Sequence, residues 1–315
     1  MKLPLNLPDA RNRPFDVVGC GLNMMDLLIM VRGHPEPNTK QGLEYYEYCV
    51  GGQVATAMVA CSRLGWRTRY VGAFGDDDNG KIARKSLEAE GIDLGSCQIS
   101  TATPNGFSVI LVDNKNGDRT VLWSRDSNLR LDPKHIDRQT ICSGRVLLVD
   151  CHDTAASTVA ARYARAAGNR TVIDVERVRP GIGKLLSEID IIITAQDFPT
   201  ELTGIVDEGA ALRALRDAYQ PSVACLTLGA EGSLAIVGDT EIRTPGFKVP
   251  VVDSTGAGDV FRAGFISGWL RAGASAEVDE VLLYANAVAG LNCRGFGGRT
   301  AIPNARDVDE LLRLR

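Results

Sequence analysis

The chain has 315 residues, a formal net charge of −4 at pH 7 and 44% hydrophobic residues, which is typical of a globular protein. Nucleic acid is excluded as the main partner, because binding to its phosphate backbone normally needs a basic surface. The most apolar short run, residues 189–193, is too short to cross a bilayer and fits a buried strand, so we expect no membrane partner.

The eight cysteines are scattered without any C-x-x-C pair, and there are only three histidines. This spacing excludes the common zinc sites and favours reduced, mostly buried thiols, as in a cytoplasmic enzyme. Residues 1–14 contain no apolar stretch, so we interpret them as an N-terminal extension rather than a signal peptide. We expect one domain over residues 15–315.

Short apolar, β-branched runs alternate with stretches of helical spacing along the chain. In chain order they predict a strand at 17–18, a helix at 54–64, a strand at 146–149, a helix at 155–167, strands at 171–175 and 189–194, a helix at 208–218, strands at 223–228 and 249–252, and helices at 260–271 and 278–292. The alternation predicts a three-layer α/β/α fold, in which helices cover both faces of a mostly parallel sheet.

Two regions interrupt this alternation. Residues 42–50 are Tyr-rich and extended in character, and the strand-like runs 106–112 and 119–123 are joined by a turn signal at 114–118. We interpret them as a small β-sheet lid over a cleft, formed by about 27–50 and 104–124. A hairpin without any such role remains the alternative.

A turn of small residues links the predicted strand at 249–252 to the next helix. Gly256, Ala257 and Gly258 have almost no side chain, so an anion can closely approach the unpaired N–H groups at the helix start. Such a site suits a phosphoryl group in transfer. Asp259 follows in the first helical turn, where it can accept the proton of an attacking hydroxyl. Alternatively, Asp259 only stabilises the helix dipole.

The stretch from Asp253 to Phe261, D-S-T-G-A-G-D-V-F, closely resembles the C-terminal signature of the ribokinase-like (PfkB) carbohydrate kinases. Gly51-Gly52 followed by Arg63-Leu64-Gly65 resembles the N-terminal signature of the same family. Residues 71–80 and 226–232 resemble two further blocks, and all four occur in family order between about 16 and 303.

The resemblance implies a catalytic role for four residues of the signature: Asp259 as the base, and Gly256, Ala257 and Gly258 as the anion hole. Asp253 would help to organise a nearby cation site. The resemblance also implies ATP and Mg²⁺ as cofactors, and many family members are activated by K⁺.

The same resemblance implies the substrate and nucleotide contacts. Asp26 matches an acidic residue that hydrogen-bonds sugar hydroxyls, as a carboxylate can with two acceptor oxygens. Gly51 and Gly52 would let the substrate lie against the backbone, and Asn23 would join them. The nucleotide contacts would come from five residues nearer the C-terminus: Thr227, Gly229, Gly232, Asn286 and Ala289. For the last two, ordinary helix packing is the alternative.

The sequence departs from the family pattern in three places. Thr56 stands where Asn is frequent, and residues 195–198 lack the N-x-x-E pattern found near the metal in many members. Arg262 follows the signature where a smaller residue is common. One helical turn beyond the anion hole, it would reach a phosphate or lie on the surface.

Several stretches, among them 174–177 and 293–303, resemble the ketohexokinase and sulfofructose-kinase branches. We therefore expect a ketose or a related sugar or sugar acid as the substrate. Lys40 matches a substrate-binding lysine of the sulfofructose kinases, but Trp123 and His152 stand at their other anion-binding positions. Trp123 would then stack on a sugar or a base, or pack within the lid or a dimer.

Three other functions remain open from the sequence. A nucleoside kinase on the same fold would need an apolar, aromatic substrate pocket. A non-catalytic sugar-binding regulator is opposed by the intact run from Gly256 to Asp259. A nicotinamide-binding oxidoreductase is opposed by Met24, which stands where a third glycine is needed. Family analogy also implies a homodimer formed through the lid.

Overall fold

The computed structural model describes residues 1–115 and 119–314. Its centre is an eight-stranded sheet in the order β14-β13-β12-β11-β10-β9-β1-β4. The strands are β1 (Val17–Cys20), β4 (Thr68–Val71), β9 (Val146–Asp150), β10 (Arg170–Val175), β11 (Ile191–Thr194), β12 (Val223–Thr227), β13 (Ser233–Val237) and β14 (Thr240–Thr244). All neighbouring strands pair in parallel except at β13, which is antiparallel to both of its neighbours.

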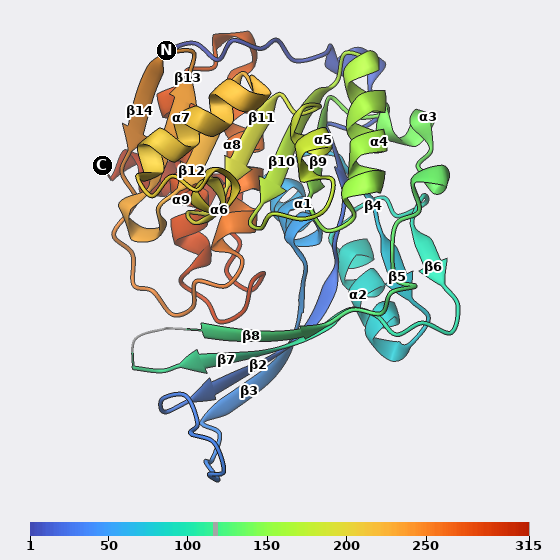
Figure 1. The fold of residues 1–315 in the computed structure, drawn as a ribbon, viewed down its shortest axis with the longest axis vertical. Coiled ribbons are helices and arrows are strands. Elements are labelled where there is room, and N and C mark those ends of the chain that lie inside the picture. The colour runs from blue at the N-terminus through green and yellow to red at the C-terminus, as the bar shows by residue number, and fades with distance from the viewer. Residues whose placement is uncertain (116–118, 315) are drawn as a thin grey trace.

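Helices cover both faces of this sheet, so the expected three-layer α/β/α architecture is confirmed (Figure 1). Alternate residues of a strand point to opposite faces, and in β9 Leu148 joins one apolar core while Leu147 and Val149 join the other. The first core contains α1 (Gln53–Arg63), α2 (Asp78–Ala89), α8 (Ala257–Ala272), α9 (Val278–Asn292) and α10 (Ala305–Arg313). The second contains α3 (Arg138–Ile141), α4 (Thr154–Ala166), α5 (Ile182–Leu186), α6 (Phe198–Thr203) and α7 (Glu208–Tyr219).

A second sheet stands off the central one, at the bottom of Figure 1. Its strands lie in the order β3-β2-β7-β8, with β3 (Tyr45–Gly51), β2 (Met24–Val31), β7 (Phe107–Asp113) and β8 (Arg119–Ser124). They overlap the ranges expected for the lid, and we call this sheet the lid sheet. The predicted turn at 114–118 lies partly outside the described residues. A third, two-stranded sheet pairs β5 (Ala73–Gly75) with β6 (Gln98–Ser100).

The strand predicted at 249–252 is wrong, because the structure has irregular backbone there. Pro250 cannot donate a hydrogen bond to a sheet ladder, and the side chains of Val251 and Val252 are exposed. The apolar run therefore lies on the rim of a cavity rather than in the sheet.

The N-terminal residues pack on the main body of the protein. The amide of Leu3 donates to the carbonyl of Ala276 at 2.8 Å, and the amide of Val278 donates to the carbonyl of Met1 at 2.8 Å. Within the described part of the chain, no helix has the length and apolar character needed to cross a membrane.

Candidate active site

A cavity of about 540 Å³ opens beside the first turn of α8. Gly256, Ala257, Gly258 and Asp259 all line it, so the structure places the whole predicted catalytic run at one cavity. Gly256 has a left-handed φ of 73°, and a Cβ on it would lie 2.8 Å from the carbonyl oxygen of Gly298. Only glycine fits there, and the turn that it makes places the start of α8 at the cavity.

Asp259 shares this cavity with a second carboxylate. Asp174 stands near the end of β10 and is buried, and it interacts electrostatically with Asp259. Burial and the nearby charge of Asp174 raise the pKa of Asp259 well above its usual value. Burial likewise raises the pKa of Asp174 to about 6. Two acids in contact with different surroundings are typical of a site that moves a proton.

Arg262 neutralises part of this acidic pair. Its Nη2 lies 3.1 Å from Oδ1 of Asp174, and both side chains are only 3% exposed. The same Nη2 donates to the carbonyl of Ile193 at 3.3 Å. Sequence reasoning left Arg262 between a phosphate contact and a surface position. The surface position is wrong: Arg262 is buried, and its partners Asp174 and the carbonyl of Ile193 are protein groups.

The guanidinium of Arg262 also explains why the turn ends in glycine. A Cβ on Gly258 would lie 2.6 Å from Nη1 of Arg262, which is closer than real contacts allow. Gly258 therefore serves both the approach of an anion and the packing of the arginine under it.

The predicted nucleotide contacts line the same cavity: Thr227, Gly229, Gly232, Asn286 and Ala289. Gly232 has a φ of 98°, and a Cβ on it would lie 2.2 Å from the carbonyl oxygen of Thr244. The amide of Asn286 donates to that carbonyl at 3.2 Å and to Oγ of Ser233 at 3.1 Å. Asn286 thus fixes the wall of the cavity, in addition to any contact with a ligand.

The predicted substrate residues gather where the lid sheet meets the core. Asp26 of β2 is buried and accepts a hydrogen bond from Oγ of Ser108 on β7. A Cβ on Gly51 would lie 2.0 Å from Oδ2 of Asp26, so only glycine leaves room for that carboxylate. Burial raises the pKa of Asp26, while Ser108 and the positive charge of Arg299 act in the opposite direction.

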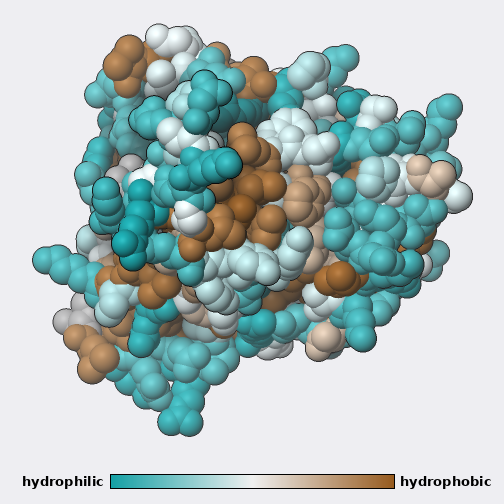
Figure 2. All heavy atoms as spheres, turned by 90° about the horizontal axis from the view of Figure 1, so that it is seen from below, coloured by the Kyte–Doolittle hydropathy of each residue, from teal (hydrophilic) through white to brown (hydrophobic). Residues whose placement is uncertain are grey.

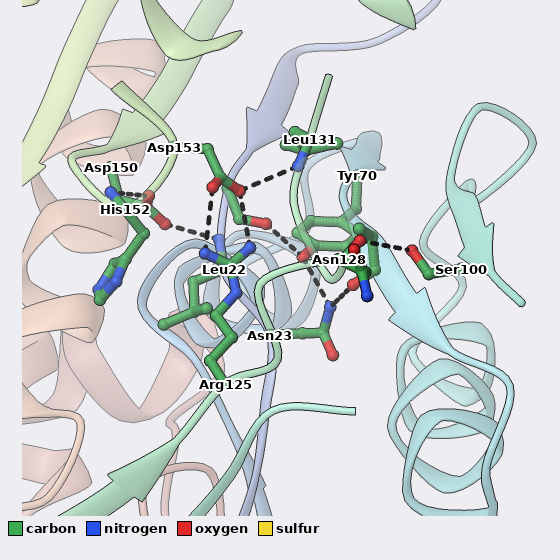
Figure 3. Close-up of polar contacts among 12 residues, drawn as sticks. Leu22, Asn23, Tyr70, Ser100, Arg125, Asn128, Leu131, Asp150, His152 and Asp153 are labelled. Carbon is green, nitrogen blue, oxygen red and sulfur yellow. Dashed lines mark hydrogen bonds and ion pairs between the residues drawn. The ribbon is translucent and has the colours of Figure 1, made fainter. Parts of the chain in front are cut away.

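Asn23 and Gly52 lie where the lid sheet joins the core. The side-chain amide of Asn23 donates to the carbonyl of Ala73 at 2.7 Å, and its buried Oδ1 has no partner among the described residues (Figure 3). This leaves one acceptor for a ligand. Gly52 has a φ of 93°, and a Cβ there would lie 2.4 Å from Cα of Asn23.

Beside Asn23, polar groups collect at the ends of β1 and β9 (Figure 3). The carboxylate of Asp150 accepts from the amides of Leu22 at 2.6 Å and His152 at 2.9 Å, and burial raises its pKa to about 6. Arg125, just after β8, binds Asp153 with two hydrogen bonds of 2.7 and 3.1 Å. The lid sheet is thus tied to the core on this side.

The structure does not bring Lys40 together with the other substrate residues. Lys40 is exposed in the connection between β2 and β3, beyond the free end of the lid sheet. Asp26 lies five residues before that end of β2, which corresponds to about 17 Å of strand. The role expected for Lys40 from the sulfofructose kinases has no support in this geometry.

Asp253 holds the anion-hole loop in place. Its Oδ1 accepts from the amide and hydroxyl of Thr255 at 2.8 and 2.7 Å, and its Oδ2 accepts from the amide of Gly297 at 2.9 Å. This carboxylate shapes the loop through both oxygens, and its role toward a cation stays a prediction.

Sequence reasoning missed three polar residues that line the cavity or bridge to it. Glu176 follows β10 and lines the cavity, as does Gln53 at the start of α1. Arg119 of the lid sheet also lines it, and its Nη1 donates to Oγ of Ser254 at 2.7 Å. The motifs near these residues were visible, but only folding brings them to the anion-hole loop.

Comparisons with known proteins agree with this geometry. The ATP-dependent ribose-1-phosphate kinase of Halopiger xanaduensis is 30% identical to this chain over 302 residues, which cover 95% of this chain and 98% of that protein. The nucleoside kinase of Methanothermobacter thermautotrophicus is 28% identical, with 92% and 93% covered. The ribokinase structure from Thermotoga maritima has the same fold, with a TM-score of 0.81 at 21% identity and 95% and 99% covered.

A family model decides the assignment. The model for the pfkB family carbohydrate kinases matches residues 15–305, which contain every element of both main sheets. This chain belongs to the pfkB family of carbohydrate kinases and is an ATP-dependent kinase.

Proposed function

We propose that this enzyme transfers the γ-phosphoryl group of ATP to a hydroxyl of a ribose-type sugar, with Asp259 as the general base. The observation that carries the proposal is the position of Asp259. It stands in the first turn of α8, beside the small-residue turn and in the same cavity as the glycine loop of Gly229 and Gly232. A base, an anion hole and a nucleotide cavity therefore meet at one point.

The reaction follows from these groups. Asp259 takes the proton of the substrate hydroxyl as its oxygen attacks the γ-phosphorus. The new O–P bond forms while the bond from phosphorus to the β-γ bridging oxygen breaks, and ADP leaves. The amides at the start of α8 offset the charge that develops on the phosphoryl oxygens.

The acidic groups of the cavity fit Mg²⁺, which prefers oxygen ligands and usually keeps several waters. Asp174 is paired with Arg262, and Asp259 is assigned as the base, so Glu176 is the carboxylate most available to the metal. Within the described residues there is no group of three or more His, Cys, Asp or Glu that could hold an ion alone. Glu176, water and phosphate oxygens would therefore hold it together, and bound Mg²⁺ would neutralise phosphate charge. We also propose that Asp253 organises a K⁺ site through its loop.

The comparisons favour ribose over the ketose expected from sequence, since the relatives act on ribose 1-phosphate, ribose or nucleosides. They do not single out the ketohexokinase branch. Asp26 would accept hydrogen bonds from the sugar hydroxyls, and the free Oδ1 of Asn23 would accept another. A nucleoside remains the second candidate, because the lid sheet offers the exposed ring of Trp123 to the cleft side.

An ADP-release assay with Mg-ATP tests the proposal. The panel contains D-ribose, ribose 1-phosphate, fructose and nucleosides, and the Asp259→Asn variant purified in parallel controls for contaminating kinases. We expect a ribose-type compound to give the highest kcat/KM, with no signal from the variant above background. If fructose were preferred, the ribose assignment would be wrong. If folded protein released no ADP with any compound, catalysis itself would be contradicted.

A further inference from the structure

Trp123 is exposed on the lid sheet although its ring is large and mostly apolar. It lies on β8 and leaves 65% of its surface uncovered by the described chain. Tryptophan is usually well buried on average, so such a ring needs a ligand or a neighbour to cover it. Trp123 is therefore not packed within the lid, which was one of the roles that the sequence left open.

The register of the lid sheet fixes the face on which Trp123 lies. Cys49, Asp26, Ser108 and Trp123 are directly paired across β3, β2, β7 and β8. Directly paired residues point to the same side of a sheet. At one end of this row, Sγ of Cys49 lies 3.0 Å from a Cβ position on Gly297 in the core. The row therefore faces the core, and Trp123 shares its face with the sugar-binding candidate Asp26.

Two arginines tie the strand of Trp123 to the core on either side of it. Arg119, four residues earlier on the same face of β8, donates to Ser254 beside the anion hole at 2.7 Å. Arg125, two residues later, binds Asp153 beside Asn23. Trp123 therefore lies on β8 between a contact to Ser254 of the anion-hole loop and a contact to Asp153.

We infer that Trp123 forms the roof of the substrate site and stacks on the C–H face of the sugar ring. This inference rests on the proposed function. Trp123 and Asp26 are two inter-strand spacings apart, about 10 Å between backbones, which leaves room for a five-membered ring between their side chains. A ring held at its hydroxyl edge by Asp26 presents its apolar face to a neighbour on the same sheet, and indole is the side chain suited to cover it.

The tryptophans give a direct readout of binding. The chain has three, and Trp66 is half-buried while Trp269 is fully buried, so a change in emission on adding sugar would come from Trp123. We would titrate the wild type with D-ribose, ribose 1-phosphate and fructose, none of which absorbs at the excitation wavelength. We expect the sugar with the highest kcat/KM to change the emission with a midpoint near its KM. The variant Trp123→Phe should lose this signal, and Trp66→Phe should keep it.

Kinetics separate a stacking role from a structural one. Trp123→Ala should raise the KM for the sugar about tenfold, because losing one stacking contact weakens binding by about that factor. The kcat and the KM for ATP should stay within about threefold of the wild type. Trp123→Phe should restore most of the loss. Thr120→Ala is the matched control, since Thr120 is an exposed residue on the opposite face of β8.

The outcomes distinguish the two proposals. If the wild type phosphorylates a sugar, but Trp123→Ala keeps its KM and saturating sugar leaves the emission unchanged, the roof is wrong and the kinase function stands. If a nucleoside is the substrate and Trp123→Ala raises the KM for the nucleoside but not for any sugar, Trp123 stacks on the base and the inferred stacking on the sugar ring is wrong. If no compound is phosphorylated, the proposed function fails first and the inference fails with it.

Discussion

Asp259 combines two properties that a base in phosphoryl transfer needs. It stands beside the amides of the anion hole, and its raised pKa, caused by burial and by Asp174, strengthens it as a proton acceptor. Asp259→Asn keeps the size of the side chain and removes its ability to accept the proton. We expect kcat to fall by about 10²–10⁴-fold, with binding of ATP and sugar retained.

Single-turnover kinetics and equilibrium titration of Mg-ATP check this expectation. The matched control is Asp239→Asn, because Asp239 is fully exposed beyond β13 and is not among the residues that line the cavity. A kcat within threefold of wild type in Asp259→Asn would remove this residue from the mechanism.

Arg262 sets the pH at which this base ionises. Its positive charge stabilises the carboxylate of Asp259 and so holds the pKa below the value that burial and Asp174 alone would give. In Arg262→Gln that pKa rises further. Because the base acts in its ionised form, the acidic limb of the kcat/KM profile should shift to higher pH.

The matched variant Arg262→Lys keeps the charge and should leave the limb near its wild-type position. Breaking the buried pair with Asp174 should also cost about 3–5 kcal/mol of stability. Circular dichroism at each pH of the profile shows whether the variant stays folded, so the shift of the limb is measured separately from the loss of stability. An unchanged limb in Arg262→Gln would show that the arginine does not tune the base.

Among single residues, the sequence predicted those whose role depends only on their neighbours along the chain. Gly256, Ala257, Gly258 and Asp259 are consecutive, and their chemistry follows from one helix start. The environment of Arg262 was not predictable, because its partner Asp174 lies on another strand and becomes its neighbour only in the sheet. For the same reason, sequence alone left the side of the lid that Trp123 faces undecided.

Helix α1 shows at the level of one element how glycine positions the site. Gly52 precedes its first turn with a φ of 93°, and Gly65 follows its last turn with a φ of 95°. A Cβ on Gly52 would meet the backbone of Asn23 at 2.4 Å, whereas nothing lies within 4 Å of a Cβ on Gly65. Both positions have a φ that favours glycine, but a Cβ has room only at Gly65.

This difference gives a matched pair of variants. Gly65→Ala should lower the free energy of unfolding by about 1–3 kcal/mol through backbone strain alone. Gly52→Ala should cost about 1–3 kcal/mol more, because the Asn23 backbone cannot yield to the added methyl group, and the KM for the sugar should rise. Chemical denaturation measures both. Equal losses in the two variants would show that the contact with Asn23 is not restrictive.

Among the elements, the long helices were predictable and the strand at 249–252 was not. The expected helix at 278–292 has the observed bounds; it is apolar almost all round, and its buried residues pack in the first core. Residues 249–252 carry the same apolar residues as a strand, yet they lie beside a cavity where no neighbouring strand pairs with them. Whether such a run forms a strand depends on a neighbouring strand that can pair with it, so the run alone does not predict it.

For the whole molecule, the alternation of elements was enough to predict the layers, but not how the lid sheet is attached. Its strands come from two distant segments, and they meet the core through Arg119, Arg125 and the connection at Gly52. These contacts join parts of the chain that are far apart in sequence. They explain why the cleft is built between two sheets and why the site is complete only in the folded chain.

The outer face of the lid sheet carries the last prediction. Tyr48, Leu27, Val109 and Leu122 are paired in one row on the side opposite Trp123, and Tyr48 and Leu122 are 60% and 58% exposed. Seen from the lid side, apolar surface gathers in the middle of this face (Figure 2). Such a surface on a four-stranded sheet fits a second copy of itself, because a two-fold interface needs only one self-complementary patch.

We therefore expect light scattering to give twice the chain mass of 33.8 kDa for the wild type. A lysine at Tyr48 or Leu122 would place a charge in the apolar interface, so each variant should shift the mass to that of the monomer. Val206→Lys, at an exposed apolar residue outside the lid sheet, should leave the dimer intact. A wild type that stays monomeric at tens of micromolar, or a dimer indifferent to both lid lysines, would contradict an interface through this face.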